Sequence, residues 1–162
     1  MSRTVLVIPG ALLASALATQ AFAQEGKYDA QYCVAGPVQV IAHADGYVAG
    51  VGTYIGVSPN VFPEQTSWRC TVAWAVIGDQ VDSGGTCEFA DAAGDKGFGV
   101  WSRKGDVQKA EGVWHMVHGT GKFAGMSMDG KFTPIAQWSP QAGASWDAVC
   151  NHGWGTYSKK SS

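Results

Sequence analysis

The segment VWHMVHGTGKFAGMSMDGKF, residues 113–132, is the stretch of this 162-residue chain that decides its fold. An apolar run leads into a glycine-rich centre, residues 119–125, and a second strand-like run follows it. Glycine readily adopts the positive φ angles of a tight turn, and the Thr120 hydroxyl can bond nearby backbone groups. The segment therefore predicts two strands joined by a compact turn.

The glycine-rich centre, GTGKFAG, resembles the GGTGKF-type segment of plant dirigent proteins and the GGTG segment of allene oxide cyclases. His118 stands where those families usually carry the first glycine. Both families are calycin-like eight-stranded β-barrels, so the resemblance implies this fold and structural roles for Gly119, Thr120, Gly121 and Gly125. It also implies a barrel cavity for a hydrophobic or aromatic compound, and trimers are common in these families.

Composition also favours an all-β protein. The four leucines all lie within the first 17 residues, and the remaining chain relies on Val, Ile, Trp, Tyr and Phe, with glycine throughout. These residue types suit a pleated, half-buried surface. No window shows a sustained 3.6-residue apolar stripe with helix-capping residues.

The N-terminal residues have the features of a secretory signal. Arg3 gives a positive start, residues 5–17 form an apolar core, and Ala21-Phe22-Ala23 is a small-residue cleavage site. We expect residues 1–23 to be a signal peptide cut after Ala23, and residues 24–162 to form one β-barrel domain in the periplasm or outside the cell. No later run approaches the twenty apolar residues of a membrane-spanning helix.

Turn residues divide the chain into eight expected strands in an antiparallel meander, as in a sandwich or small barrel. Pro37, with Gly36, and Pro134 are expected to mark bulges or strand ends. The expected strands cover residues 30–42, 47–57, 68–77, 80–91, 97–102, 108–118, 126–138 and 145–157.

The hairpin of residues 68–91 has a predictable register. A turn at Gly78-Asp79 pairs positions whose numbers sum to 157, which places Cys70 opposite Cys87. The same register gives the favourable pairs Trp68 with Phe89, Arg69 with Glu88, Thr71 with Thr86, and Val76 with Val81. We expect a Cys70–Cys87 disulfide, with Trp68, Val72 and Trp74 facing inward and Arg69 and Glu88 outward.

Four cysteines without a CxxC spacing favour disulfides over a zinc site in an exported chain. Three connectivities are possible for four cysteines. We favour the one in which Cys70–Cys87 leaves Cys33 to pair with Cys150. This second bond would join the first and last strands, where a barrel closes.

The formal net charge of −2 is small and dispersed, so no nucleic-acid partner is expected. The expected partners are a small hydrophobic or aromatic molecule and other copies of the chain, as a dimer or trimer. Seven tryptophans either fill the barrel or line a cavity inside it. The candidate ligand-binding residues are Trp68, Trp74, Phe89, Trp114 and His115.

No catalytic motif and no cofactor-binding motif is present, so no cofactor is expected. His115 and His118, three residues apart on a strand, should lie on opposite faces and not share a metal ion. The acidic residues Glu88, Glu111 and Asp147 could form a carboxylate pair, but the sequence gives no reason for them to meet. We expect them to be solvated or to lie at the barrel rim.

Three functions fit the sequence. The first is an exported, non-catalytic β-barrel that binds a small hydrophobic or aromatic ligand. The second is an isomerase or cyclase of the allene oxide cyclase type, with His115 or an acidic residue handling protons in the cavity. The third is a structural or inhibitory domain with a filled barrel.

Overall fold

The computed structural model describes residues 24–59, 65–138 and 145–159. The predicted signal peptide lies outside the described residues. Eight strands account for nearly all of them, and one short 3₁₀-helix, η1 (Gly121–Phe123), follows the sixth strand. The strands are β1 (Gln24–Ala44), β2 (Tyr47–Ser58), β3 (Thr66–Ile77), β4 (Gln80–Ala90), β5 (Lys96–Asp106), β6 (Gly112–Gly119), β7 (Met126–Trp138) and β8 (Trp146–Lys159).

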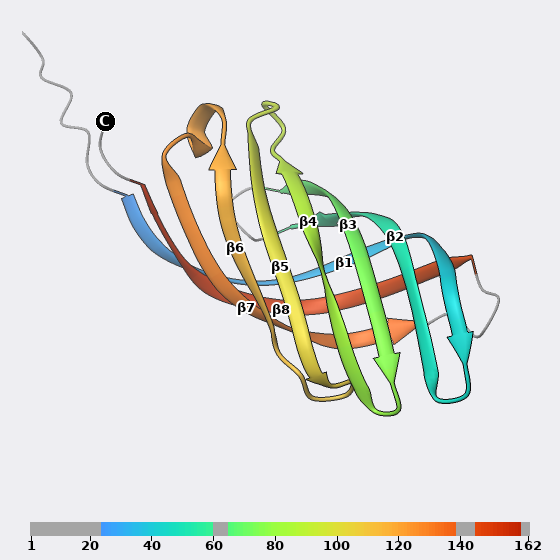
Figure 1. The fold of residues 1–162 in the computed structure, drawn as a ribbon. Helices are drawn as coiled ribbons and strands as arrows, with labels where there is room; N and C mark the ends of the chain where they lie inside the picture. Colours follow the sequence, from blue (N-terminus) through green and yellow to red (C-terminus); the bar gives the residue numbers. More distant parts are fainter. Residues whose placement is uncertain (1–23, 60–64, 139–144, 160–162) are drawn as a thin grey trace, which may run out of the picture.

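The eight strands form a closed antiparallel barrel in the order of the sequence, with β1 paired to both β2 and β8 (Figure 1). This confirms the all-β, eight-stranded barrel. Antiparallel neighbours joined by short turns place η1 and the β4–β5 turn at one end, here called the η1 end. The β1–β2, β3–β4 and β5–β6 turns lie at the other, the hairpin end.

Strand β1 is longer than predicted and begins at Gln24 instead of residue 30. Its first residues alternate, with Lys27 and Asp29 exposed and Tyr28 and Ala30 more buried, and they pair with the end of β8. The bulge expected at Gly36-Pro37 lies instead between Val40 and Ala42. The bulge expected at Pro134 is confirmed by a register shift between Pro134 and Ala136.

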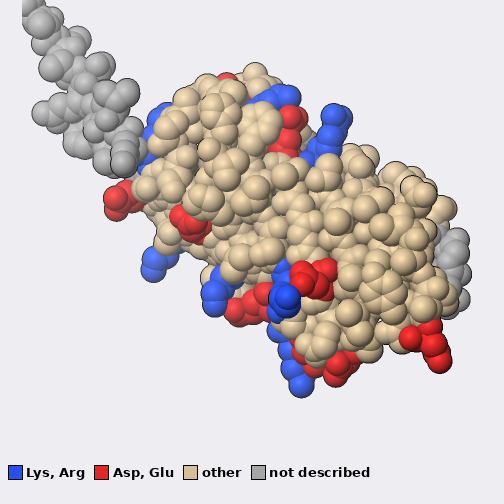
Figure 2. Space-filling view, in the orientation of Figure 1, with Lys and Arg blue, Asp and Glu red and all other residues tan. Residues whose placement is uncertain are grey.

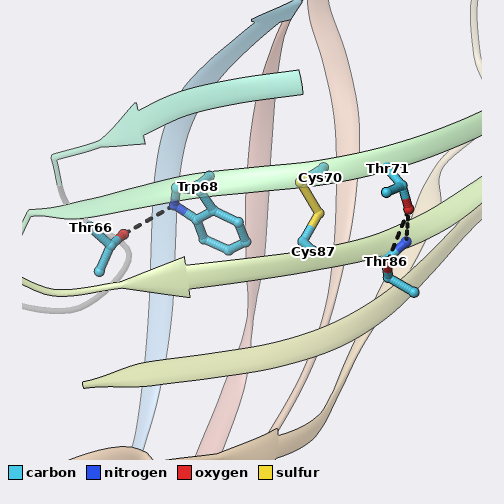
Figure 3. The surroundings of a disulfide bond; sticks show 6 residues. All are labelled: Thr66, Trp68, Cys70, Thr71, Thr86 and Cys87. Carbon is cyan, nitrogen blue, oxygen red and sulfur yellow. Dashed lines mark hydrogen bonds between the residues drawn. A yellow bond between two sulfur atoms is a disulfide. The ribbon is translucent and has the colours of Figure 1, made fainter. Parts of the chain in front are cut away.

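The β3–β4 hairpin has the predicted register, with Trp68 opposite Phe89 and Cys70 opposite Cys87. Figure 3 shows the Cys70–Cys87 disulfide between the two strands, and the hydroxyls of Thr71 and Thr86 are 2.9 Å apart beside it. Arg69 does lie opposite Glu88. The ion pair of Glu88, however, is with Lys96 on β5, at 2.9 Å.

The second disulfide, Cys33–Cys150, is also confirmed and joins β1 to β8 across 117 residues of sequence. Cys70 and Cys87 are buried inside the barrel, whereas Cys33 is exposed on its outside. Because β1 and β8 are the first and last strands, this bond fastens the seam of the barrel.

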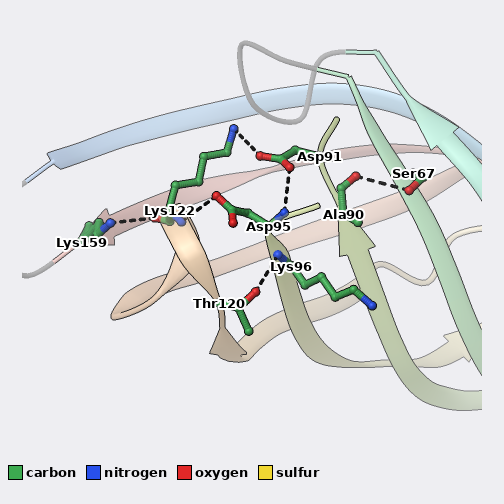
Figure 4. Close-up of polar contacts among 8 residues, drawn as sticks. All are labelled: Ser67, Ala90, Asp91, Asp95, Lys96, Thr120, Lys122 and Lys159. Atoms are coloured by element: carbon green, nitrogen blue, oxygen red, sulfur yellow. Dashed lines mark hydrogen bonds and ion pairs between the residues drawn. The ribbon is translucent and has the colours of Figure 1, made fainter. Parts of the chain in front are cut away.

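The η1 end is closed by the glycine-rich turn. Gly121 and Gly125 have φ angles of 53° and 72°, as the turn motif requires, and Phe123 between them is 1% exposed. The Thr120 hydroxyl bonds a backbone group, as expected, but on the neighbouring strand. It accepts from the backbone N–H of Lys96 on β5, at 3.0 Å (Figure 4).

An ion pair and a hydrogen bond tie this turn to the loop between β4 and β5, and a second hydrogen bond lies within that loop (Figure 4). Lys122 Nζ lies 2.7 Å from Asp91 Oδ2, and its backbone N–H donates to Asp95 Oδ2 at 2.9 Å. The Asp95 N–H in turn donates to Asp91 Oδ1. These contacts hold Phe123 against Phe89 in an edge-on contact, with ring centroids 5.1 Å apart.

The outer surface has an apolar region over β1–β3. Ile41, Val51, Ile55, Val57 and Ile77 are 39–63% exposed there. Much of the surface in Figure 2 is free of charged side chains, which lie mainly along its upper and lower edges and at its ends. Within the described part of the chain, no helix is long and apolar enough to cross a membrane.

Candidate functional site

The inside of the barrel contains a cavity of about 410 Å³. This volume lies within the range of small-molecule pockets, about 300–1,000 Å³. Its lining includes His43 and Gln137, which are exposed near the hairpin end and place the opening there. At the other end Phe89 and Phe123, which are fully buried, separate the cavity from the η1 turn.

Aromatic rings form the wall nearest the η1 end. Trp68 is stacked on Tyr32, with centroids 5.6 Å apart and an interplanar angle of 11°. It also meets Trp114 edge-on at 5.7 Å. Stacked and edge-on pairs are the favoured arrangements of aromatic rings. The cavity thus has a preformed flat apolar wall, and Tyr28, Trp74 and Trp101 extend the aromatic lining around it.

A buried polar pair lies in the same cavity. The Tyr54 hydroxyl of β2 donates to Asp147 Oδ2 of β8 at 2.7 Å, although β1 runs between the two strands. Gly36 of β1 pairs with Asp147 and lets β2 approach closely, because a Cβ there would lie 2.0 Å from the Thr53 carbonyl oxygen. Tyr54 and Asp147 are only 6% and 8% exposed. Burial, and then the hydrogen bond to Asp147, raises the pKa of Tyr54, so its proton is held firmly.

Three polar atoms lining the cavity have no hydrogen-bond partner in the described chain. They are the second oxygen of Asp147, Oδ1, and the indole nitrogens of Trp74 and Trp114. Buried polar atoms in native proteins are nearly always bonded, and leaving one unpaired costs about 1–3 kcal/mol. One acceptor and two donors, all on residues that line the cavity, are therefore unpaired in the described chain.

Arg103 on β5 supplies positive charge to the cavity wall near the hairpin end. Its Nε donates to the Ala110 carbonyl oxygen at 3.0 Å, and its Nη2 donates to that of Val107. Burial lowers the pKa of Arg103, but a guanidinium remains charged at neutral pH. Burial raises the pKa of the Tyr28 hydroxyl to about 12, so this group also keeps its proton at neutral pH and can donate a hydrogen bond.

The predicted site residues divide into three groups. Trp68, Trp74 and Trp114 line the cavity together. Phe89 is 0% exposed and packs behind Trp68, with centroids 5.1 Å apart, so it supports the wall without lining it. The prediction that His115 lines the cavity is wrong. Its side chain is 55% exposed on the outer face of the barrel, where it bonds Asp129.

Asp147 differs most from its expectation, because it was assigned to the solvent or the rim and is buried in the cavity. Tyr54 and Arg103 were not predicted as site residues at all. A sequence signal for Asp147 does exist: it shares the inward phase of the final strand with Val149 and Asn151. The other two acidic candidates, Glu88 and Glu111, form ion pairs with Lys96 and Lys131.

The two histidines of β6 are both exposed, which corrects the expectation that they occupy opposite faces. A register shift between Phe98 and Gly99 of β5 disturbs the alternation near His118, which stacks on Phe98. In the described residues no group of three or more His, Cys, Asp or Glu side chains could hold a metal ion.

Comparison with known proteins yields a structural match alone. No protein-family model matches the sequence, and no curated protein is significantly similar to it. Among solved structures, the chain is similar to a pterocarpan synthase dirigent protein, with a TM-score of 0.50 and 12% identity. The match covers 86% of this chain and 94% of the other. The chain therefore has a dirigent-like, eight-stranded β-barrel fold, as the glycine-rich turn predicted.

Proposed function

We propose that this protein is an exported, non-catalytic β-barrel that binds a small hydrophobic or aromatic molecule in its cavity. The observation that carries the proposal is the 410 Å³ cavity lined by Tyr32, Trp68, Trp74, Trp101 and Trp114. A filled barrel, the third hypothesis, would have no such space. Two disulfides fit an oxidising compartment such as the periplasm or the extracellular medium.

Native mass spectrometry of the protein isolated from its export compartment tests the proposal. A co-purifying small molecule, and a mature chain that begins at Gln24, are the expected results. Val72→Phe should abolish ligand binding, because Val72 is buried in the cavity wall and a larger ring would occupy the space. Ala73→Phe on the exposed side of the same strand is the matched control. Equal binding by both variants would contradict the cavity as the site.

A second candidate function is proton transfer, as in an isomerase or cyclase. The buried Tyr54–Asp147 pair favours it, since a carboxylate with one free oxygen in an apolar cavity is suited to acid–base chemistry. Incubating the co-purified molecule with the protein and following it by mass spectrometry separates the two functions. Conversion that Asp147→Asn abolishes would favour catalysis, and an unchanged molecule would favour binding alone.

We further propose that copies of the chain associate through the apolar face of β1–β3. Ile55 is 60% exposed at its centre, between Ala35 of β1 and Arg69 of β3. Ile55→Lys should convert an oligomer to monomers in light scattering. Val113→Lys, on the exposed side of β6, should not. A wild-type protein that is monomeric at high concentration would refute this assembly.

A further inference from the structure

We propose that the molecule bound in the cavity carries a protonated amine on an aromatic body, and that the amine binds Asp147 Oδ1. This inference rests on the proposed ligand-binding function and specifies its ligand. It follows from the charge of one buried side chain, from the positions of the cations in the chain, and from the aromatic lining.

Asp147 has half of the hydrogen bonding that a buried carboxylate needs. Its Oδ2 accepts from Tyr54, while Oδ1 has no partner, and the side chain lies in a cavity lined largely by Val, Trp and Tyr. An ionised carboxylate in such surroundings is costly unless it is paired. The fold has therefore left one strong acceptor unpaired on a residue that lines the cavity.

Among the described residues no cation forms an ion pair with Asp147. Four lysines, Lys96, Lys104, Lys122 and Lys131, pair with Glu88, Asp82, Asp91 and Glu111. Of these, Lys131 also lines the cavity, where its ammonium pairs with Glu111. Arg103 lines the same cavity but stands on β5, three strands away from Asp147 on β8, and donates to backbone carbonyls of the β5–β6 turn. The counter-ion of Asp147 is then expected to come from the ligand.

The aromatic lining also favours a cation on the ligand. Faces of Trp and Tyr rings attract ammonium groups, and the attraction grows when water is excluded. The indole N–H groups of Trp74 and Trp114, both unpaired, would in addition favour an oxygen acceptor elsewhere on the ligand. A neutral alcohol would satisfy Oδ1 as a donor but would leave the buried charge without a counter-ion.

Three probes with one skeleton test the inference: 4-phenylbutylamine, 4-phenylbutanol and butylbenzene, titrated at pH 7 by calorimetry. The amine should bind at least about fivefold tighter than the alcohol, because hydrogen bonds to charged groups are stronger than those between neutral groups by about 1 kcal/mol or more. In Asp147→Asn this preference should vanish. Asp82→Asn, which alters an exposed carboxylate that pairs with Lys104 outside the cavity, should preserve it.

The possible outcomes separate the inference from the proposed function. If the alcohol or the hydrocarbon binds as tightly as the amine, the amine inference is overturned while ligand binding stands. If none of the three binds, both are overturned. An amine preference that survives in Asp147→Asn would also refute the assignment to this carboxylate. The amine-to-alcohol ratio is measured on the unaltered protein, so the test does not depend on the folding of a variant.

Discussion

The two parts of the barrel interior are built in opposite ways. Toward the η1 end, Phe89, Met116 and Phe123 are at most 3% exposed and do not line the cavity. Around Tyr54 and Asp147 the same eight strands enclose about 410 Å³ of space. The contrast indicates that the η1 end stabilises the fold by packing, and that the rest of the interior is kept open for another purpose.

The open part is held by covalent bonds where packing is missing. Cys70 and Cys87 themselves line the cavity. Cys33–Cys150 joins β1 and β8 beside Val34 and Val149, which also line it. Neither disulfide lies among the phenylalanines of the η1 end. A hollow barrel loses the dispersion contacts of a solid core, and cross-links that restrict the unfolded chain offset part of that loss.

The largest effect should follow from opening the seam. Replacing Cys33 and Cys150 with alanine should lower the free energy of unfolding by about 5 kcal/mol, because the bond closes a loop of more than 100 residues. Replacing Cys70 and Cys87, 17 residues apart, should cost about 3 kcal/mol on the same model. Urea denaturation measures both, and a larger loss for the Cys70–Cys87 pair would show that loop length does not decide the difference.

A phenylalanine from each part gives the next comparison. Phe89→Ala should cost about 3–5 kcal/mol, because the ring is fully enclosed and its loss leaves a hole. Phe132 is 8% exposed and lines the cavity, so fewer contacts surround its ring. We expect Phe132→Ala to cost less than Phe89→Ala under the same thermal or urea unfolding. Equal losses would mean that the rest of the interior is packed as tightly as the η1 end.

Adding a methyl group, by replacing glycine with alanine, tests the same difference in packing between the η1 end and the cavity wall. A Cβ at Gly97 would overlap the Phe89 ring, whereas at Gly153, in the cavity wall, its nearest neighbour would be 3.2 Å away on Tyr32. Gly97→Ala should destabilise by about 1–3 kcal/mol through overpacking. Gly153→Ala should destabilise by less than Gly97→Ala, because the Tyr32 ring would have to move by only a few tenths of an ångström. A neutral Gly97→Ala would show that Phe89 can move aside.

Much of the fold could be predicted because its determinants are local. The alternation of Trp68, Cys70 and Val72 together with the Gly78-Asp79 turn sets one register, and that register brings Cys70 to Cys87. The glycine-rich turn similarly requires the positive φ angles found at Gly121 and Gly125. Each of these features depends on a few neighbouring residues and on rules of strand pairing.

The Tyr54–Asp147 pair could not be predicted, because it depends on how β2, β1 and β8 lie side by side. Tyr54 and Asp147 are 93 residues apart and touch where Gly36 lets β2 approach closely. An acidic residue is ordinarily a surface residue, which is why Asp147 was assigned to the rim. His115 was misplaced for a related reason: its neighbour Trp114 takes the inward phase of β6, and one strand cannot send both side chains inward.

The smallest expected effect is a loss of folding stability at low pH, and it arises at the η1 end. The Lys122 ammonium bonds the buried Asp91 carboxylate. This bond is the main cause of the lowered pKa of Asp91. An unfolded aspartate titrates near pH 3.9, so the stabilisation from this contact is complete above about pH 4 and is lost as the pH falls toward the lowered native pKa. The stability difference between wild type and Asp91→Asn should therefore shrink below about pH 4, measured by thermal unfolding from pH 7 to pH 2.5.

Asp45→Asn, an exposed change at the hairpin end, serves as the matched control for this experiment. Its difference from wild type should stay small and nearly constant with pH, because the Asp45 side chain is open to water. A constant difference for Asp91→Asn as well would mean that the ion pair with Lys122 does not fasten the η1 turn. The turn that carries Phe123 would then be held by apolar contacts and by its hydrogen bonds to Asp95 and Lys96, without a contribution from the ion pair.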